Sequence, residues 1–84
     1  ILFVADSYNH KIKKLYSATQ TAITFLGTGK SGSQNGPANV ATFYEPGDVS
    51  IADGKLFIAD TNNHVIRVAE LESGEVRTLE IRGL

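Results

Sequence analysis

LFIADTNNHVIR, residues 56–67, is the stretch that decides the fold, because the chain already contains it once as LFVADSYNHKIK, residues 2–13. The two copies are 54 residues apart, since Asp6 and Asp60 hold the same place in them. Repeats of this length are typical of solenoids and propellers, whose units bury their apolar faces against neighbouring units. The repeat therefore predicts an architecture, whereas function depends on sites that a scaffold motif does not specify.

Short apolar runs rich in branched and aromatic residues predict β-strands on both sides of this stretch. The turns Asp53-Gly54 and Glu72-Ser73-Gly74 separate runs that favour antiparallel pairing. The second copy is expected to have four consecutive strands, at residues 48–52, 55–59, 65–71 and 75–81. The first copy shows only the last three of these, at residues 1–5, 11–16 and 21–26.

Four short antiparallel strands joined by tight turns are typical of a propeller blade. The sequence thus predicts an all-β fold, a partial β-propeller with one complete four-stranded antiparallel blade plus three strands of a second blade. We assign residues 1–27 to the partial blade, 28–46 to an inter-blade loop and 47–84 to the complete blade. Within the loop, Pro37 favours one short helical turn. This turn should place Val40 and Phe43 on one face and insert Phe43 between the blades.

Composition excludes several classes of protein. The 84 residues contain no cysteine, which removes disulfides, cysteine-bound zinc and thiol catalysis and is compatible with a reducing, cytoplasmic location. The net charge is −1, and no apolar run approaches the roughly 18 residues of a membrane span. Because the chain starts with Ile1 inside a strand-like run, without an initiator methionine, we expect it to be a piece of a longer polypeptide.

A carboxylate, an amide and an imidazole recur at the same places in both copies, as Asp6, Asn9, His10, Asp60, Asn63 and His64. Carboxylate and imidazole are good metal ligands, but no third ligand lies nearby in either copy. Aspartate and asparagine also bond their own backbone in turns, and asparagine tolerates left-handed geometry. We therefore interpret all six residues as structural, with the imidazole bonded to a neighbouring backbone group at the blade interface. We expect no metal and no cofactor.

The pattern LFIADTNNHVIR closely resembles the NHL repeat, which is named for its Asn-His-Leu core. The rest of the chain, including the loop GPANVATFYEPG, looks like the propeller segment of thioredoxin-like NHL-repeat-containing proteins and their bacterial relatives. The resemblance implies a propeller of about six blades, of which this chain would hold fewer than two. It departs from the family pattern at Lys11 and Val65, which stand where the family name has leucine.

The segment Gly27-Thr28-Gly29-Lys30-Ser31-Gly32 has the outline of a phosphate-binding loop. A complete P-loop needs a glycine where this chain has Thr24, and it needs a long helix after the lysine. The residues that follow, Ser33 to Pro37, cannot supply that helix N-terminus. We interpret the segment as an ordinary connection between blades.

A small basic and aromatic patch is a candidate interaction surface, and it consists of Tyr8, Lys11, Lys13, Lys14 and Tyr16. Resemblance to the NHL family raises the possibility of RNA binding, since some of its propellers bind RNA on such a face. The second copy has Val65, Arg67 and Val68 at the equivalent lysine positions, so the patch does not continue along the repeat. A solvated outer strand face is the simpler interpretation.

These observations lead to one function hypothesis and two alternatives. The leading hypothesis is a non-enzymatic propeller scaffold or protein-interaction module. Its partners would be the remaining blades of a parent propeller or other copies of the chain, together with a protein partner that the sequence does not name. No membrane partner is expected, and nucleic acid is not the expected ligand. The alternatives are an RNA-binding propeller that uses the basic face, and part of a propeller enzyme whose site other blades complete.

Overall fold

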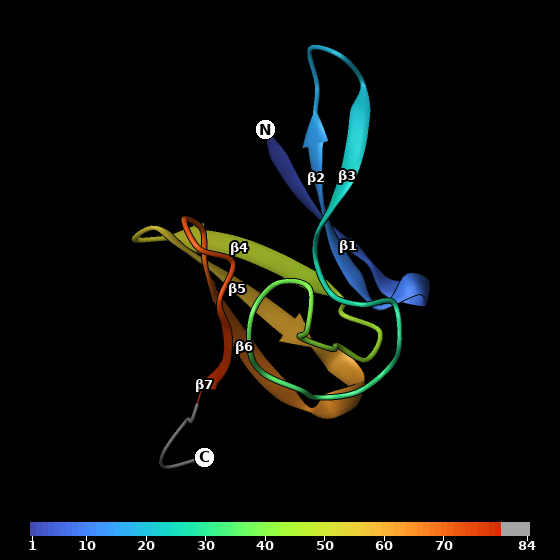
Figure 1. Ribbon diagram of the computed structural model, residues 1–84, viewed down its shortest axis with the longest axis vertical. Coiled ribbons are helices and arrows are strands. Elements are labelled where there is room, and N and C mark those ends of the chain that lie inside the picture. Colours follow the sequence, from blue (N-terminus) through green and yellow to red (C-terminus); the bar gives the residue numbers. More distant parts are fainter. Residues whose placement is uncertain (80–84) are drawn as a thin grey trace.

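The computed structural model describes residues 1–79, which form two antiparallel sheets (Figure 1). The first sheet contains three strands, β1 (Leu2–Asp6), β2 (Lys11–Tyr16) and β3 (Thr21–Leu26). The second contains four strands, β4 (Asp48–Ala52), β5 (Lys55–Asp60), β6 (Val65–Glu70) and β7 (Val76–Leu79). In both sheets the strands pair in sequence order.

The prediction of an all-β fold with three strands of one blade and four of the next is confirmed. All seven predicted strands form. The bounds of β2, β3 and β4 are those predicted, and each described end of the other strands lies within one residue of its prediction. The last strand was predicted to reach residue 81, and its final two positions lie outside the described residues.

The turn inside each copy of the motif is a short 3-10 helix, η1 (Ser7–Asn9) in the first and η2 (Thr61–Asn63) in the second. Each turn ends at a histidine in the left-handed conformation, with φ of 57° at His10 and 58° at His64. The sequence suggested asparagine for left-handed geometry, but histidine occupies it in both copies. Histidine is one of the few residues enriched at positive φ.

Each sheet has two faces, because side chains alternate along a strand. The alanine face carries Phe3, Ala5 and Ile12 in the first sheet and the identical residues Phe57, Ala59 and Ile66 in the second. The aspartate face carries Leu2, Val4, Asp6 and Lys13 in the first sheet and Leu56, Ile58, Asp60 and Arg67 in the second.

The core lies between the alanine face of the first sheet and the aspartate face of the second. Its fully buried members come from both sheets and from the loop between them, and they include Ile12, Leu26, Phe43, Leu56 and Ile58. Phe3 and Ala5 pack against this cluster from the first sheet. The two blades therefore stack face to face, with the alanine face of one against the aspartate face of the next.

The loop between β3 and β4 curls across β5 and β6, as its cyan-to-green ribbon shows in Figure 1. The carbonyl of Pro37 accepts hydrogen bonds from the N–H groups of Val40 and Ala41, both at 2.9 Å, so a single turn forms there. Phe43 is fully buried between the blades, whereas Val40 is 46% exposed. The predicted common face of Val40 and Phe43 is therefore wrong, because the turn ends at Ala41 and the helical spacing does not continue to Phe43.

Candidate functional site

The most concentrated polar site lies where the inter-blade loop crosses the aspartate face of the second sheet. Asp60 and Arg67 pair there at 2.9 Å, and both side chains are fully buried. The Asp60 carboxylate also accepts the Tyr44 N–H at 2.8 Å and the Asn63 side-chain amide at 2.8 Å. Strand alternation and the 3-10 turn bring these groups together. Asp60 ends β5, and Arg67 on β6 pairs with Ile58, two residues before Asp60 and on the same face of the sheet.

Arg67 fastens the loop to the blade. Its Nη1 donates to the Thr42 carbonyl at 2.7 Å, and its Nη2 donates to the Gln34 carbonyl and to Asn35 Oδ1, both at 2.8 Å. The guanidinium also lies 5.0 Å from the centre of the Phe43 ring. We call the set Asp60, Asn63 and Arg67, with its loop partners, the clasp, since it ties residues 32–44 to the second sheet.

The first sheet holds the other side of the same loop. The Glu45 N–H donates to His10 Nδ1 at 3.0 Å, and the Ser7 hydroxyl donates to the Pro46 carbonyl at 2.6 Å. The His10 ring also meets the Tyr44 ring edge-on, with 5.6 Å between the centres. The loop is thus bonded to both blades at once.

The equivalent of the clasp in the first sheet is open. Asp6 pairs with Lys13 at 3.4 Å and accepts the Asn9 amide at 3.0 Å, but the side chains of Asp6 and Lys13 are 26% and 35% exposed. The Asn9 hydrogen bond lowers the pKa of Asp6, and burial opposes it; the hydrogen bond and charge of Lys13 and the charge of Lys11 lower the pKa further. The same residue pattern therefore occurs covered in one copy and uncovered in the other.

The two sheets end in complementary open faces. On the first sheet the aspartate face is exposed, with Leu2 at 57% and Val4 at 43%, whereas the equivalent Leu56 and Ile58 are fully buried. On the second sheet the alanine face is open around Ile66, which is only half-buried while the equivalent Ile12 is fully buried; Val68, on the same face, is 1% exposed.

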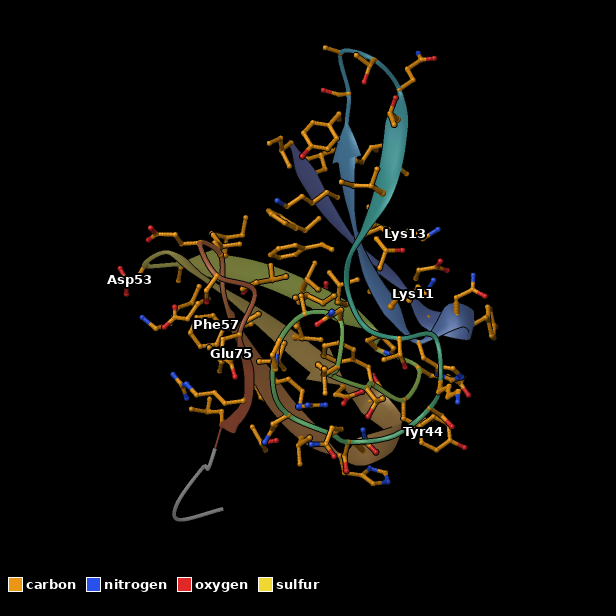
Figure 2. The ribbon with its side chains drawn as sticks, in the orientation of Figure 1. Lys11, Lys13, Tyr44, Asp53, Phe57 and Glu75 are labelled. Carbon is orange, nitrogen blue, oxygen red and sulfur yellow. The ribbon has the colours of Figure 1, made fainter. Side chains whose placement is uncertain are left out.

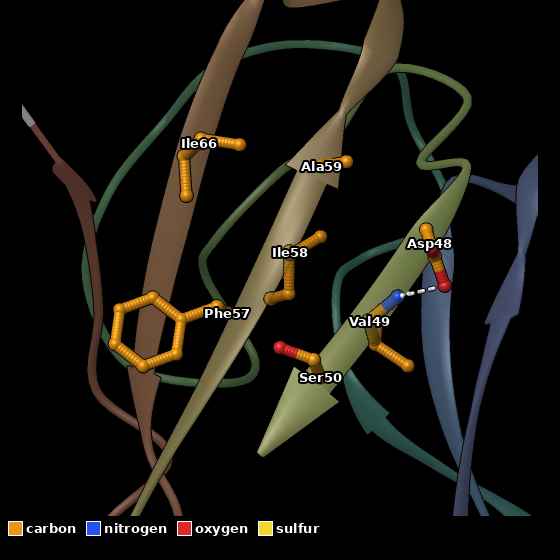
Figure 3. A pocket seen from close by; sticks show the side chains of 7 residues that line it. All are labelled: Asp48, Val49, Ser50, Phe57, Ile58, Ala59 and Ile66. Carbon is orange, nitrogen blue, oxygen red and sulfur yellow. Dashed lines mark hydrogen bonds between the residues drawn. The ribbon is translucent and has the colours of Figure 1, made fainter. Parts of the chain in front are cut away.

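A shallow hollow of about 150 Å³ lies on this open alanine face (Figure 3). Phe57 and Ile66 line it with Ile58 and Ala59, and Asp48, Val49 and Ser50 form its β4 side. His64 and Thr61, at the turn beyond it, are exposed.

The predicted basic and aromatic patch is not one surface. Alternation along β2 places Lys11 and Lys13 on the aspartate face (Figure 2), and places Lys14 and Tyr16 on the opposite face. Lys13 pairs with Asp6, and Lys14 lies 4.4 Å from the centre of the Phe25 ring. Tyr8, which is 88% exposed, lies on the η1 turn.

The glycine-rich segment uses its backbone N–H groups inside the loop. Gly27 donates to Ala38, Thr28 to Ala41 and Gly32 to Phe43, at 2.9, 3.2 and 3.0 Å. The N–H of Lys30 is bonded to the Thr28 hydroxyl at 3.2 Å. These four donors therefore point at protein acceptors, which is not the arrangement of a phosphate cradle.

Residues 1–79 hold no group of three or more histidine, aspartate or glutamate side chains placed to bind a metal ion. They also hold no helix with the length and apolarity that a membrane crossing requires.

Arg67 is the important residue that the sequence analysis missed. It stands between the apolar residues Ile66 and Val68 on a strand expected to be covered by its neighbours. A charge in that position needs a buried partner, and the repeat supplies Asp60 at the start of the same turn. The matching Asp6 and Lys13 of the first copy carry the same signal.

Comparison with known proteins agrees with this geometry. Residues 43–69 match the NHL repeat family. Over 87 residues the chain is 45% identical to the Arabidopsis thaliana protein SUPPRESSOR OF QUENCHING 1, chloroplastic, a match that covers 99% of this chain and 8% of that protein. It is 43% identical to human and 42% identical to bovine NHL repeat-containing protein 2, over 96% of this chain and 12% of each. The chain thus spans about a tenth of the length of these relatives, and it is an NHL-repeat segment built of propeller-type blades.

Proposed function

We propose that this chain is a non-enzymatic scaffold module, whose work is to join further NHL-type blades through its two open sheet faces. One observation carries the proposal. The aspartate face of the first sheet and the alanine face of the second are open, and each is equivalent to a face that the chain buries within itself. The partner that fits an open face is therefore another blade of the same kind, in a longer polypeptide or in a second copy.

The conspicuous polar groups favour a scaffold over a reactive site. Asp60, Asn63 and Arg67 are engaged in the clasp, and His10 is engaged with the Glu45 N–H. The hollow on the alanine face is lined mainly by apolar side chains, as an interface between packed sheets would be.

The RNA alternative has less support. A phosphate backbone needs several cations on one surface. Here Lys11 and Lys13 lie on the opposite side of the sheet from Lys14, and Lys13 is paired with Asp6.

The proposal is tested by association of the chain with itself. Joining an aspartate face to an alanine face is a head-to-tail contact, which needs one face from each molecule. Sedimentation equilibrium of the natural chain should show mass rising with concentration. Val4→Glu should block the first face and Ile66→Glu the second, so each variant alone should be monomeric.

A mixture of Val4→Glu and Ile66→Glu is the decisive experiment, because each variant retains the face that the other lacks. We expect one-to-one dimers in the mixture. Thr19→Glu, on the exposed turn between β2 and β3, is the control and should associate like the natural chain. A natural chain that stays monomeric throughout the concentration range would refute the proposal. Circular dichroism would verify that the variants are folded.

A further inference from the structure

The exposed turn of the second copy has the same polar groups that hold the loop against the first sheet. Ser7 and His10, which bond the loop, correspond to Thr61 and His64. Phe3, Ala5 and Ile12, which pack beside that loop, recur unchanged as Phe57, Ala59 and Ile66. The second copy therefore presents a docking surface, and the loop segment that the first copy binds shows what kind of segment would fit it.

In the first copy the occupant is a short stretch of the loop with a fixed order of groups. Phe43 fills the space between the blades, the N–H of Glu45 donates to His10 Nδ1, and the carbonyl of Pro46 accepts from Ser7. The aromatic side chain, the donor and the acceptor thus lie at positions i, i+2 and i+3.

We propose that Thr61, His64 and the hollow beside Ile66 bind a peptide segment with this order of groups, an aromatic residue followed by a free N–H at i+2 and a carbonyl at i+3. The natural source is the inter-blade loop of another NHL-type repeat. This inference rests on the proposed function and adds to it the chemistry of the contact and the residue that recognises the segment.

The exposure of His64 and the weak hydrogen bonding of Thr61 suit this role. His64 is exposed and takes the same left-handed backbone conformation as His10. Among residues 1–79 the Thr61 hydroxyl makes one hydrogen bond, a long one of 3.4 Å to the Ala59 carbonyl, whereas the Ser7 hydroxyl makes a 2.6 Å bond to the loop. The hollow is open beside them, and Phe57 and Ile66 provide its apolar surface (Figure 3).

A second copy of this chain is the competing occupant, but it fits less completely. Its exposed Leu2 and Val4 could cover the hollow, as Leu56 and Ile58 cover Ile12. Its own loop is already bonded to its own sheets, so it has no free segment to reach His64.

The probe is a synthetic peptide with the sequence of residues 34–47, QNGPANVATFYEPG, added to isotope-labelled protein. The protein carries Val4→Glu, which keeps the alanine face of the second sheet free while blocking self-association. Nuclear magnetic resonance should show saturable shifts at Thr61, His64 and Ile66, and no comparable shifts at Ser7 and His10, where the chain's own loop lies.

Matched variants test each group separately. A peptide with alanine in place of Phe43, and one with an ester in place of the Tyr44–Glu45 amide, should each bind about tenfold more weakly. In the protein, His64→Asn keeps an acceptor at a left-handed position and should retain binding. His64→Gly accepts the same backbone without strain but lacks the acceptor, so it should lose a similar factor.

Two results would overturn the inference. One is absence of saturable peptide binding in a chain that still associates with itself, which would leave the scaffold proposal standing. The other is binding that ignores the phenylalanine or the ester, or that shifts Asp6 and Lys13 instead of His64. Absence of both self-association and peptide binding would remove the scaffold proposal as well.

Discussion

At the scale of single residues, the buried pair of Asp60 and Arg67 has the largest energetic consequence. Both charges are removed from water, and their hydrogen bonds to the loop offset part of that loss, although Arg67 Nε has no partner among the described residues. Removing one partner leaves the other charged and buried, which typically costs about 3–5 kcal/mol. That is a large share of the roughly 5–15 kcal/mol that stabilises a typical folded domain.

Arg67→Met should therefore unfold the chain or lower its free energy of unfolding by about 3 kcal/mol or more. Lys13→Met is the matched control, because Lys13 holds the equivalent place in the first copy and its pair with Asp6 is partly exposed. An exposed pair contributes about 0–1 kcal/mol, so the control should change stability little. Urea denaturation of both variants measures the difference, and equal losses would contradict the buried role of Arg67.

The pKa of Asp6 gives a second test at this scale. Its folded-state pKa is lowered, first by the Asn9 hydrogen bond, so this carboxylate stabilises the fold above the unfolded pKa of about 3.9. That contribution is lost as pH falls through the lower, folded-state pKa. Asn9→Ala should raise the pKa of Asp6, as followed by a side-chain resonance titration. An unchanged titration would show that the amide does not govern this carboxylate.

Residue chemistry could be read from the sequence only in part. The repeated Asp, Asn and His predicted polar turns, and the structure places all six at such turns. Whether the turn faces solvent or a loop depends on which blade follows or precedes it, and this information lies outside the motif. The lysine patch was misjudged for a simpler reason, because adjacent residues on a strand point to opposite faces.

At the scale of elements, the point where β3 meets the loop depends on one glycine. Gly27 has φ of 103°, and a Cβ there would lie 2.8 Å from the His10 carbonyl oxygen and 3.3 Å from the Phe43 ring. The close approach involves backbone, which has little freedom to move away. Any larger residue at this junction would therefore be strained twice, once by the positive φ and once by the close contacts with His10 and Phe43.

Gly27→Ala should lower the melting temperature much more than Gly54→Ala. Gly54 also has positive φ, of 72°, but a Cβ there meets nothing within 4 Å, so its substitution incurs backbone strain alone. Strain of this kind costs about 1–3 kcal/mol, and the clash at Gly27 adds to it. Thermal unfolding followed by circular dichroism measures both. A Gly54→Ala variant as unstable as Gly27→Ala would show that the close approach is unimportant.

Strands were more predictable than the loop. Alternation and the Asp-Gly turn are local signals, and β4 and β5 pair in the register that this turn requires. The loop has no local period, and its shape depends on distant acceptors and donors such as Arg67 and His10. The burial of Phe43 was predicted because it is the large aromatic side chain of the predicted turn, but the exposure of Val40 was not.

At the scale of the whole molecule, the head-to-tail stacking of faces links stability to concentration. Association stabilises the folded state by mass action, so the melting temperature of the natural chain should rise as protein concentration rises. The contact is mainly apolar, and added salt should weaken it little. Differential scanning calorimetry at several concentrations measures this, with Ile66→Glu as the variant whose melting temperature should stay constant. A constant value in the natural chain would speak against assembly through these faces.

Because Arg67 comes after its loop partners in the sequence, the clasp also sets an order for folding during synthesis. Arg67 bonds loop groups that were translated 25 to 33 residues earlier, at Thr42 and Gln34. Because domains begin to fold from the N-terminus while translation continues, the first sheet emerges well before the side chain that secures its loop. In an array of such repeats each blade is completed only after the next has been made. Until residue 67 has emerged from the ribosome, the loop after the first sheet stays unfastened, and this is the species that a chaperone would meet.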